Sequence, residues 1–365
     1  MIDKLKLIDW KLLLCFLLLV LSGLSVQYSA AGGDVRPWAL HQAIMIIIFL
    51  PLFFIIIIAD RNVLFNYAYL LFIISISLLL LVKSIGVTRM GATRWIHVFG
   101  VVIQPSELVK IAIILQLSRY LTNYQTHQTL IGFLSLVFIM AIPVLLTLLQ
   151  PSLGSSIIMI IIIASLLFAA GLDKKYFIFA MITCLITGPL IWQSLHDYQK
   201  SRILIFLDPS QDPLGAGYNI LQSEIAIGAG GMFGKGFLQG SQTQLRFLPE
   251  KHTDFAFAVF TEEHGFFKTL LFFSLYFYLI IKCLIIAKQS YDNFYRLVAV
   301  GISTFFSSHF FINIGMVTGL LPVVGIPLPF LSYGGSIMLA AILCFGLLLN
   351  IDINNKRYLL YAAHG

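Results

Sequence analysis

Charged residues are scarce in this chain of 365 residues: they make up 11% of it, whereas hydrophobic residues make up 59%, and the mean hydropathy is +0.95. So few charges exclude an ordinary soluble fold. Apolar runs recur that match the roughly 20 residues needed to cross a hydrocarbon core. They form blocks, whereas an outer-membrane barrel would show alternation. The sequence therefore predicts an all-α polytopic membrane protein with a single membrane-embedded domain over residues 1–365.

Cysteine is also rare, and no metal-ligand spacing is present. All four cysteines lie inside apolar runs, so we expect them to be core residues. They are Cys15, Cys184, Cys283 and Cys344.

A nucleotide-binding motif is lacking as well. The glycine-rich segment GAGGMFGKGFLQG (228–240) has Ala229 where a phosphate-binding P-loop needs its first Gly, and Gly236 where it needs a hydroxyl. A dinucleotide fingerprint fails because Phe233 stands in place of a Gly. We expect no nucleotide cofactor and interpret the segment as a tight packing turn, with direct substrate contact as the alternative.

Ten apolar runs are predicted to be transmembrane helices. The first resembles a signal peptide, but its length and Tyr28 near any cleavage site favour a start-transfer helix. The runs cover about residues 12–28, 38–58, 64–83, 107–121, 130–149, 153–171, 176–194, 266–287, 297–320 and 336–351.

Ten spans place both chain termini on one side of the membrane. The short segments on that side carry twelve Lys and Arg residues, against four (Arg36, Lys83, Arg89 and Arg94) on the other. This bias predicts cytoplasmic N- and C-termini. The net charge of +7 is then mostly a topology signal, and no nucleic-acid partner is implied.

Two predicted extracytoplasmic segments are too long for simple turns. Residues 84–106 are expected to form a short interfacial helix anchored by Trp95. Residues 195–265, between the seventh and eighth spans, are rich in apolar residues, so we expect a large loop folded as short helices over the mouth of the bundle.

Charge is concentrated in FLPEKHTDFAFAVFTEEHG (247–265), which holds the four carboxylates Glu250, Asp254, Glu262 and Glu263. Such density in a charge-poor chain requires an explanation. One explanation is a functional site, and the alternative is a surface loop whose carboxylates are solvated.

The segment QPSELVK (104–110) opens the fourth span with a proline suited to a first helical turn. Glu107 and Lys110 are three residues apart and therefore share a helix face. Charges at this depth are costly and mark a cavity or a partner. A structural ion pair with a neighbouring helix is the alternative.

The segment GLLPVVGIPLPFLSYGGS (319–336) separates the last two spans with three prolines and four glycines besides its Ser-Tyr pair. Irregular backbone near membrane depth is tolerated only inside protein or beside water. We interpret it as a re-entrant wall of a cavity open to the outside.

Residues 104–110, 225–266 and 315–336 together resemble the signature blocks of the SEDS family, the RodA/FtsW-type peptidoglycan glycosyltransferases of bacteria. The short N-terminus and the wording FLPEKHTDF are most similar to the RodA branch, which acts in cell elongation. Ala229, where Ser is common, and His264, where Leu is common, are small departures, and His264 leaves the local packing open.

The resemblance implies that Asp254 is the essential catalytic aspartate and that Glu107 and Lys110 are the functionally important pair of the fourth helix. It implies lipid II as substrate, inverting transfer, a class B penicillin-binding protein as transpeptidase partner, and the bacterial cytoplasmic (inner) membrane as location. It also implies a divalent cation, Mg or Mn, as a candidate cofactor, with the metal ligands unknown.

The chemistry of such a transfer needs one carboxylate base at the acceptor hydroxyl and positive charge at the leaving diphosphate. We expect Asp254 at the outer mouth of a central cavity, with Lys110 facing that cavity beneath it. Arg202 and Lys235 or Arg246 should meet the diphosphate. The candidate substrate-binding residues are Gln104, Ser106, Arg202, Gln222, Lys235, Arg246, Glu250, His252 and Ser332.

Two other functions fit the sequence less well. A lipid II flippase would use the Glu107–Lys110 pair and the re-entrant segment as a polar track, but the two halves of the chain show no inverted repeat. A non-catalytic scaffold of the elongation complex would need no aspartate base. An Asp254→Asn variant separates these functions from a polymerase.

Overall fold

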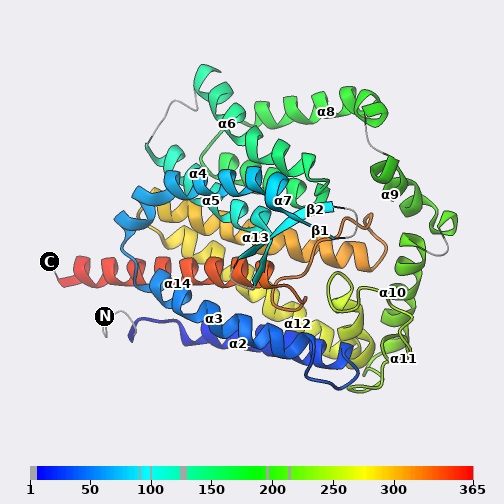
Figure 1. Cartoon of the computed structure of the whole chain (residues 1–365). Coiled ribbons are helices and arrows are strands. Elements are labelled where there is room, and N and C mark those ends of the chain that lie inside the picture. Colours follow the sequence, from blue (N-terminus) through cyan, green and yellow to red (C-terminus); the bar gives the residue numbers. More distant parts are fainter. Residues whose placement is uncertain are drawn as a thin grey trace.

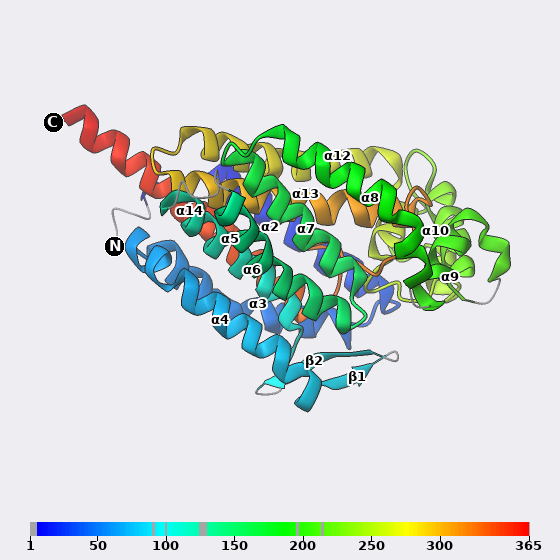
Figure 2. The same ribbon diagram turned by 90° about the horizontal axis from the view of Figure 1, so that it is seen from above.

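The computed structural model describes residues 6–89, 92–98, 101–123, 130–194, 197–212 and 215–364. Long helices run side by side in one elongated bundle (Figures 1 and 2). The start of α2 and the end of α14 lie at one end of the bundle, and α9, α10 and α11 lie at the other (Figure 1).

The bundle is built from helices on both sides of one long connecting segment. Before it come α2 (Trp10–Ala30), α3 (Trp38–Ile58), α4 (Arg61–Ile85), α5 (Pro105–Asn123), α6 (Leu130–Leu149), α7 (Leu153–Ala169) and α8 (Lys174–Ser194). After it come α12 (Ala256–Gln289), α13 (Asn293–Val317) and α14 (Gly335–His364). Asp9 and Asp292 cap the starts of α2 and α13, where their carboxylates accept backbone N–H groups that no helical carbonyl can reach.

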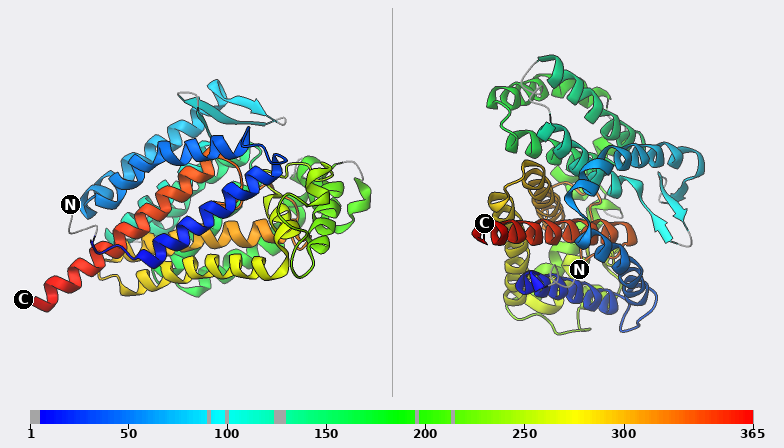
Figure 3. Two further views of the ribbon diagram at one scale, coloured as in Figure 1. Left: turned by 90° about the horizontal axis from the view of Figure 1, so that it is seen from below. Right: turned by 90° about the vertical axis from the view of Figure 1, so that its left-hand side faces the viewer.

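Helix α14 is the centre of the bundle. It packs against α3, α5, α12 and α13, and 94% of its most apolar stretch is buried, compared with 22% for α3. Figure 3 shows α14, in red, crossing the middle of the bundle. The outer helices instead expose large apolar side chains such as Ile47, Phe138 and Ile186, which suits a surface covered by lipid tails.

Among the described residues, six helical stretches are long and apolar enough to cross a membrane: α2, α3, Arg61–Val82 of α4, α12, α13 and Gly335–Leu360 of α14. Two shorter apolar stretches, Leu134–Leu149 and Leu153–Ala169, join them. The prediction of an all-α polytopic membrane protein is confirmed at this level. The count of ten spans stays a prediction, because α5, for example, carries three charges, Glu107, Lys110 and Arg119.

The predicted interfacial helix at residues 84–106 is wrong. The described part of this segment forms an antiparallel sheet of β1 (Val87–Arg89), β2 (Ala92–Val98) and β3 (Val101–Ile103), in which Val87 pairs with Trp95 and Ile96 with Ile103. The segment is rich in Val, Thr and Ile, whose branched side chains favour strands over helices. The prediction of a helix gave too little weight to these residues.

The connecting segment at 195–265 forms α9 (Asp197–Leu207), the short 3₁₀ helix η2 (Pro209–Gln211), α10 (Ala216–Gly230) and α11 (Ser241–Gln244). Helix α10 packs on α12 and α13. The expected short helices are therefore present; residues 195, 196, 213 and 214 lie outside the described part. Of the cysteines, Cys15, Cys283 and Cys344 are free and buried as predicted, whereas the side chain of Cys184 lies outside what is described.

Helix α12 is interrupted at Gly265, whose backbone (φ 71°, ψ −175°) is not helical. The glycine-rich segment supplies the hydrogen bonds that the break leaves unmade. The N–H groups of Lys235 and Gly236 donate to the carbonyls of Glu262 (3.0 Å) and Glu263 (3.1 Å), and those of Phe266 and Phe267 donate to the carbonyls of Gly231 (2.9 Å) and Met232 (3.2 Å).

This interlock requires glycine at the points of closest approach. A Cβ on Gly265 would lie 2.1 Å from the backbone nitrogen of Gly234, and a Cβ on Gly230 would lie 2.2 Å from the carbonyl oxygen of Thr261. The interpretation of residues 228–240 as a tight packing turn is therefore confirmed.

We predict that Gly265→Ala lowers the melting temperature of the detergent-solubilised protein far more than Gly171→Ala. Both glycines have positive φ (71° and 89°), but a Cβ at Gly171 meets nothing within 4 Å. Gly171→Ala should therefore cost only the roughly 1–2 kcal/mol of a left-handed alanine, whereas Gly265→Ala also forces two backbone segments apart. Equal shifts for the two variants would contradict the interlock.

Candidate functional site

Asp254 lies directly before α12, with its side chain partly exposed. Its backbone carbonyl accepts a hydrogen bond from Asn313 Nδ2 (3.0 Å), and the same amide group donates to the carbonyl of Ile326 (2.7 Å). A Cβ on Gly325 would lie 3.4 Å from Asp254 Oδ2. Asn313 of α13 thus joins the aspartate to the irregular segment between α13 and α14.

A second set of hydrogen bonds, from α2, holds the loop that carries Asp254 against the segment between α13 and α14. The buried Gln27 donates from Nε2 to the carbonyls of His252 (3.1 Å) and Leu331 (2.9 Å), and the N–H of Tyr333 also donates to His252 O (2.8 Å). The 319–336 segment is therefore irregular backbone held within protein, as predicted. Its role as the wall of an open cavity stays a prediction, as does the position of Asp254 at the mouth of one.

Three charged groups act on the Asp254 carboxyl. Desolvation by burial raises the pKa of Asp254 to about 6, and the negative charge of Glu250 contributes to this rise. The positive charges of Arg202 and Arg94 oppose it. Arg202 is fixed by a hydrogen bond from Nη1 to the carbonyl of Val323 (2.9 Å), and Arg94 by one from Nε to the carbonyl of Gln150 (2.9 Å).

Glu107 and Lys110 form an ion pair of 2.7 Å on one face of α5, as their spacing predicts. Lys110 Nζ also lies 3.0 Å from His309 Nε2, and His309 Nδ1 lies 3.0 Å from the carbonyl of Pro327. A carbonyl can only accept, so Nδ1 carries the proton and Nε2 accepts from the lysine. The pair is thereby linked through α13 to the segment that borders Asp254.

The expectation that Lys110 faces the cavity beneath Asp254 is wrong for this structure. Lys110 is 0% exposed and its ammonium is directed at Glu107 and His309. A buried ammonium needs such partners because its desolvation is expensive. Lys110 therefore reaches Asp254 through intervening groups and not across open space.

Some of the other predicted residues lie among structural hydrogen bonds and ion pairs, whereas for others no such contact of the side chain is described. Lys235 pairs with the buried Glu262 (3.1 Å), which also accepts the N–H groups of Gln242 and Thr243 at the start of α11. Ser332 Oγ accepts the N–H of Leu328 (2.9 Å), and the N–H of Gln104 donates to Ser336 Oγ (2.7 Å). Ser106 is buried with no hydrogen-bond partner for its Oγ among the described residues, and Gln222 is half-buried on α10.

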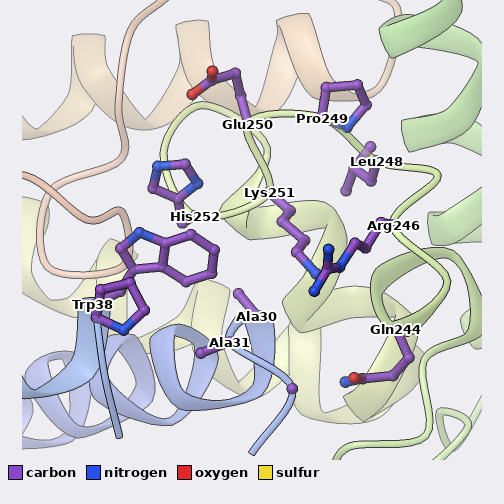
Figure 4. A pocket seen from close by; sticks show the side chains of 12 residues that line it. Ala30, Ala31, Trp38, Gln244, Arg246, Leu248, Pro249, Glu250, Lys251 and His252 are labelled. Atoms are coloured by element: carbon purple, nitrogen blue, oxygen red, sulfur yellow. The ribbon is translucent and has the colours of Figure 1, made fainter. Parts of the chain in front are cut away.

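Arg246, Glu250 and His252 come together around a pocket of about 490 Å³ between the α2–α3 connection and the loop before α12 (Figure 4). Trp38 and Lys251 complete its aromatic and charged lining. Glu250 is shared between this pocket and the electrostatic surroundings of Asp254. The assignment of these three residues to substrate binding stays a prediction.

Sequence reasoning missed the roles of four residues: Gln27, Arg94, His309 and Asn313. A signal was available for two of them. His309 and Asn313 are polar residues four positions apart in an otherwise largely apolar span, so they share one helix face. Gln27 and Arg94 could not be assigned, because their partners lie far away in the sequence.

Within the described ranges, no group of three or more His, Cys, Asp and Glu side chains comes together to hold a metal ion. The Mg or Mn expectation stays untested.

A family model described as "Cell cycle protein", covering the FtsW, RodA and SpoVE proteins, matches residues 4–357. The chain belongs to the FtsW, RodA and SpoVE family. Its membership spans almost the whole length, so the loop before α12 and the segment between α13 and α14 are both included. The resemblance seen in three separate blocks of the sequence is confirmed.

Curated relatives align with the chain over nearly its whole length, and one of them is named for an enzymatic activity. The chain is 40% identical to peptidoglycan glycosyltransferase MrdB of Escherichia coli (strain K12) over 97% of its own length and 95% of that protein. It is 36% identical to stage V sporulation protein E of Bacillus subtilis (strain 168) over 94% of its length and 96% of that protein.

Solved structures share the fold. A chain of a peptidoglycan synthase complex, in which polymerization and crosslinking are coordinated, superposes with a TM-score of 0.85 at 28% identity, covering 96% of this chain and 99% of that one. Rod shape determining protein RodA of Thermus thermophilus superposes with a TM-score of 0.71 at 25% identity, covering 94% and 96%. The chain is thus a multi-pass membrane protein of this family.

We predict that Lys110→Met strongly destabilises the protein, by about 3–5 kcal/mol, because it leaves the Glu107 carboxylate buried without its cation. Thermal unfolding in detergent measures the effect. Lys175→Met is the matched control, since it removes the same group from an exposed ion pair with Asp173 (2.6 Å) and should leave the melting temperature unchanged.

A double variant, Glu107→Leu with Lys110→Met, should recover much of the lost stability because it removes both buried charges together. Exchanging the two charges should not, since it would set a carboxylate against the acceptor nitrogen of His309. A charge-swapped protein as stable as the parent would refute this view of the network.

Proposed function

We propose that this protein is a peptidoglycan glycosyltransferase that polymerises lipid II during cell elongation, with Asp254 as the general base. The observation that carries the proposal is Asp254, whose backbone carbonyl accepts a hydrogen bond from Asn313 and whose carboxyl is under the positive charges of Arg202 and Arg94, in a chain 40% identical to a peptidoglycan glycosyltransferase along almost its whole length.

The reaction requires few groups. The 4-hydroxyl of an N-acetylglucosamine attacks C1 of the N-acetylmuramic acid on another lipid-linked chain, and the new C1–O bond forms as the bond to the diphosphate breaks with inversion. Asp254 takes the hydroxyl proton, and the diphosphate leaves with the bonding electrons. A diphosphate needs no protonation to leave, so one base with nearby positive charge is enough.

The electrostatics suit this role. With a pKa of about 6, Asp254 is largely ionised at neutral pH yet basic enough to accept a proton. Arg202 and Arg94 are the positive groups that act on it, and we assign to them the stabilisation of negative charge on the departing diphosphate. Glu107 and Lys110, buried on α5, are assigned to positioning rather than to contact with substrate.

The proposal extends to location and partner. We place the chain in the bacterial cytoplasmic (inner) membrane with both termini in the cytoplasm and residues 195–265 outside, which the Lys and Arg distribution supports. A class B penicillin-binding protein is the expected transpeptidase partner, in keeping with the likeness to a chain of a synthase complex. The separation into one membrane domain with a 195–265 loop is part of the proposal.

A flippase is the second candidate, and the buried ion pair weighs against it. A polar track for a lipid headgroup needs accessible charged groups, whereas Glu107 and Lys110 are 3% and 0% exposed. A scaffold needs no ionisable aspartate, whereas the pKa of Asp254 is raised by burial and by the charge of Glu250.

We predict that Asp254→Asn abolishes glycan polymerisation by the purified protein with its partner, because an amide cannot accept the hydroxyl proton. Binding to the penicillin-binding protein and lipid II flipping should be unaffected. Asp34→Asn, an exposed aspartate in the α2–α3 connection whose carboxylate accepts the N–H of Arg36, is the matched control. Long glycan strands made by the Asp254→Asn protein in the presence of moenomycin would rule out the base.

We predict that the polymerisation rate falls on acidification below a pH of about 6, because protonated Asp254 cannot act as base. Glu250→Gln should move this acid limb to lower pH, since removal of the neighbouring negative charge makes the ionised aspartate easier to form. Glu224→Gln on α10 makes the same charge change without acting on Asp254 and should leave the limb in place. If the acid limb of the Glu250→Gln variant stayed at the parental pH, Asp254 would not be the group whose protonation sets that limb.

A further inference from the structure

The pocket beside the Asp254 loop places two cations together. Arg246 and Lys251 both line it, and Figure 4 shows the Lys251 ammonium beside the Arg246 guanidinium. Neither side chain forms an ion pair within the described part of the chain; the Lys251 ammonium donates to the carbonyl of Thr243 (2.7 Å). Two like charges held side by side repel each other, so an anion between them would relieve that repulsion.

The pKa of Lys251 reflects the same repulsion. Burial lowers the pKa of Lys251, the positive charge of Arg246 lowers it further, and the charge of Glu263 opposes the shift. The backbone adds an independent sign of function. Arg246 (φ 61°) and Glu250 (φ 48°), both in the pocket lining, adopt left-handed conformations that non-glycine residues rarely take. Such strain gathers at ligand sites.

The remaining lining suits a sugar. The Trp38 and His252 rings stack with centroids 4.3 Å apart and planes within 7°, and burial lowers the pKa of His252, so the imidazole is neutral at neutral pH. Figure 4 shows Glu250 on another side of the pocket, across from Gln244. The pocket thus combines an aromatic wall and hydrogen-bonding groups with a pair of cations.

We propose that this pocket binds the diphosphate end of a lipid-linked saccharide, with Arg246 and Lys251 on the phosphates and the Trp38–His252 wall against the sugar. The inference rests on the proposed polymerase function and adds a second subsite to it. Glu250 lies between the two, since it lines the pocket and acts electrostatically on Asp254.

The test measures the affinity of the full chain, in nanodiscs of phosphatidylcholine, for undecaprenyl diphosphate and for lipid II. Arg246→Gln and Lys251→Gln should each weaken binding of both about tenfold, because each removes a charge-assisted hydrogen bond. Arg246→Lys should retain most of the affinity. The loss for Arg246→Gln should shrink at high salt, since this residue is exposed.

Lys268→Gln is the matched control. Lys268 is an exposed lysine three residues after the break in α12, so its substitution makes the same charge change outside the pocket and should leave the affinity unchanged. Melting temperatures identify any variant that fails to fold. Trp38→Leu provides a second test of the pocket. It should weaken lipid II binding more than undecaprenyl diphosphate binding, because only lipid II carries the sugar that would lie against the Trp38–His252 wall.

Three results would overturn the pocket. Parental affinity in both cation variants would do so, as would an equal loss in Lys268→Gln. The third is a matching loss of binding to phosphatidylglycerol vesicles, which would identify a general anionic-lipid surface. The proposed function is tested separately. Asp254→Asn should bind undecaprenyl diphosphate normally without polymerising. A parent protein that makes no glycan with its partner would refute the polymerase function and leave the binding result intact.

Discussion

The constraint on which this structure depends is that every polar backbone group in an apolar bundle needs a partner. Two stretches break the helical ladder, one at Gly265 in α12 and one between α13 and α14. The first is completed by residues 231–236, whose backbone hydrogen-bonds to both sides of the break. The second is completed by buried side chains, among them Gln27 and Asn313. Asp254 lies beside the second of these repairs, because Asn313 also donates to its backbone carbonyl.

The four carboxylates in residues 247–265 have two separate roles. Glu262 is a structural group: fully buried, it accepts hydrogen bonds from Lys235 and from the start of α11. Glu263 is likewise buried and accepts from Ser29. Glu250 and Asp254 are instead half-buried, and the charge of Glu250 raises the pKa of Asp254. One charged stretch therefore both fastens the connecting segment to α12 and supplies the ionisable groups of the candidate site.

The parts that the sequence predicted correctly depend on local pattern or on a resemblance across nearly the whole chain. Apolar blocks identify membrane helices, and the spacing of Glu107 and Lys110 places them on one face. One error comes from a partner that is distant in sequence, and the other from a local pattern that was given too little weight. His309, 199 residues from Lys110, turns the lysine into the middle of a buried network, and no local pattern reveals that contact. At residues 84–106, β-branched residues outweighed the expectation of an interfacial helix.

Helix α13 explains how a buried ion pair and a partly exposed aspartate act as one unit. His309 and Asn313, one turn apart, hold the carbonyls of the adjacent residues Pro327 and Ile326. His309 takes its other hydrogen bond from Lys110, and Asn313 gives its other one to Asp254. Each contact has a fixed donor and acceptor, so a change in the charge or position of Lys110 alters the support of Pro327 and, through the next residue, the backbone of Asp254. The Glu107–Lys110 pair is therefore connected by hydrogen bonds to the backbone of Asp254, the proposed base, although both side chains of the pair are buried.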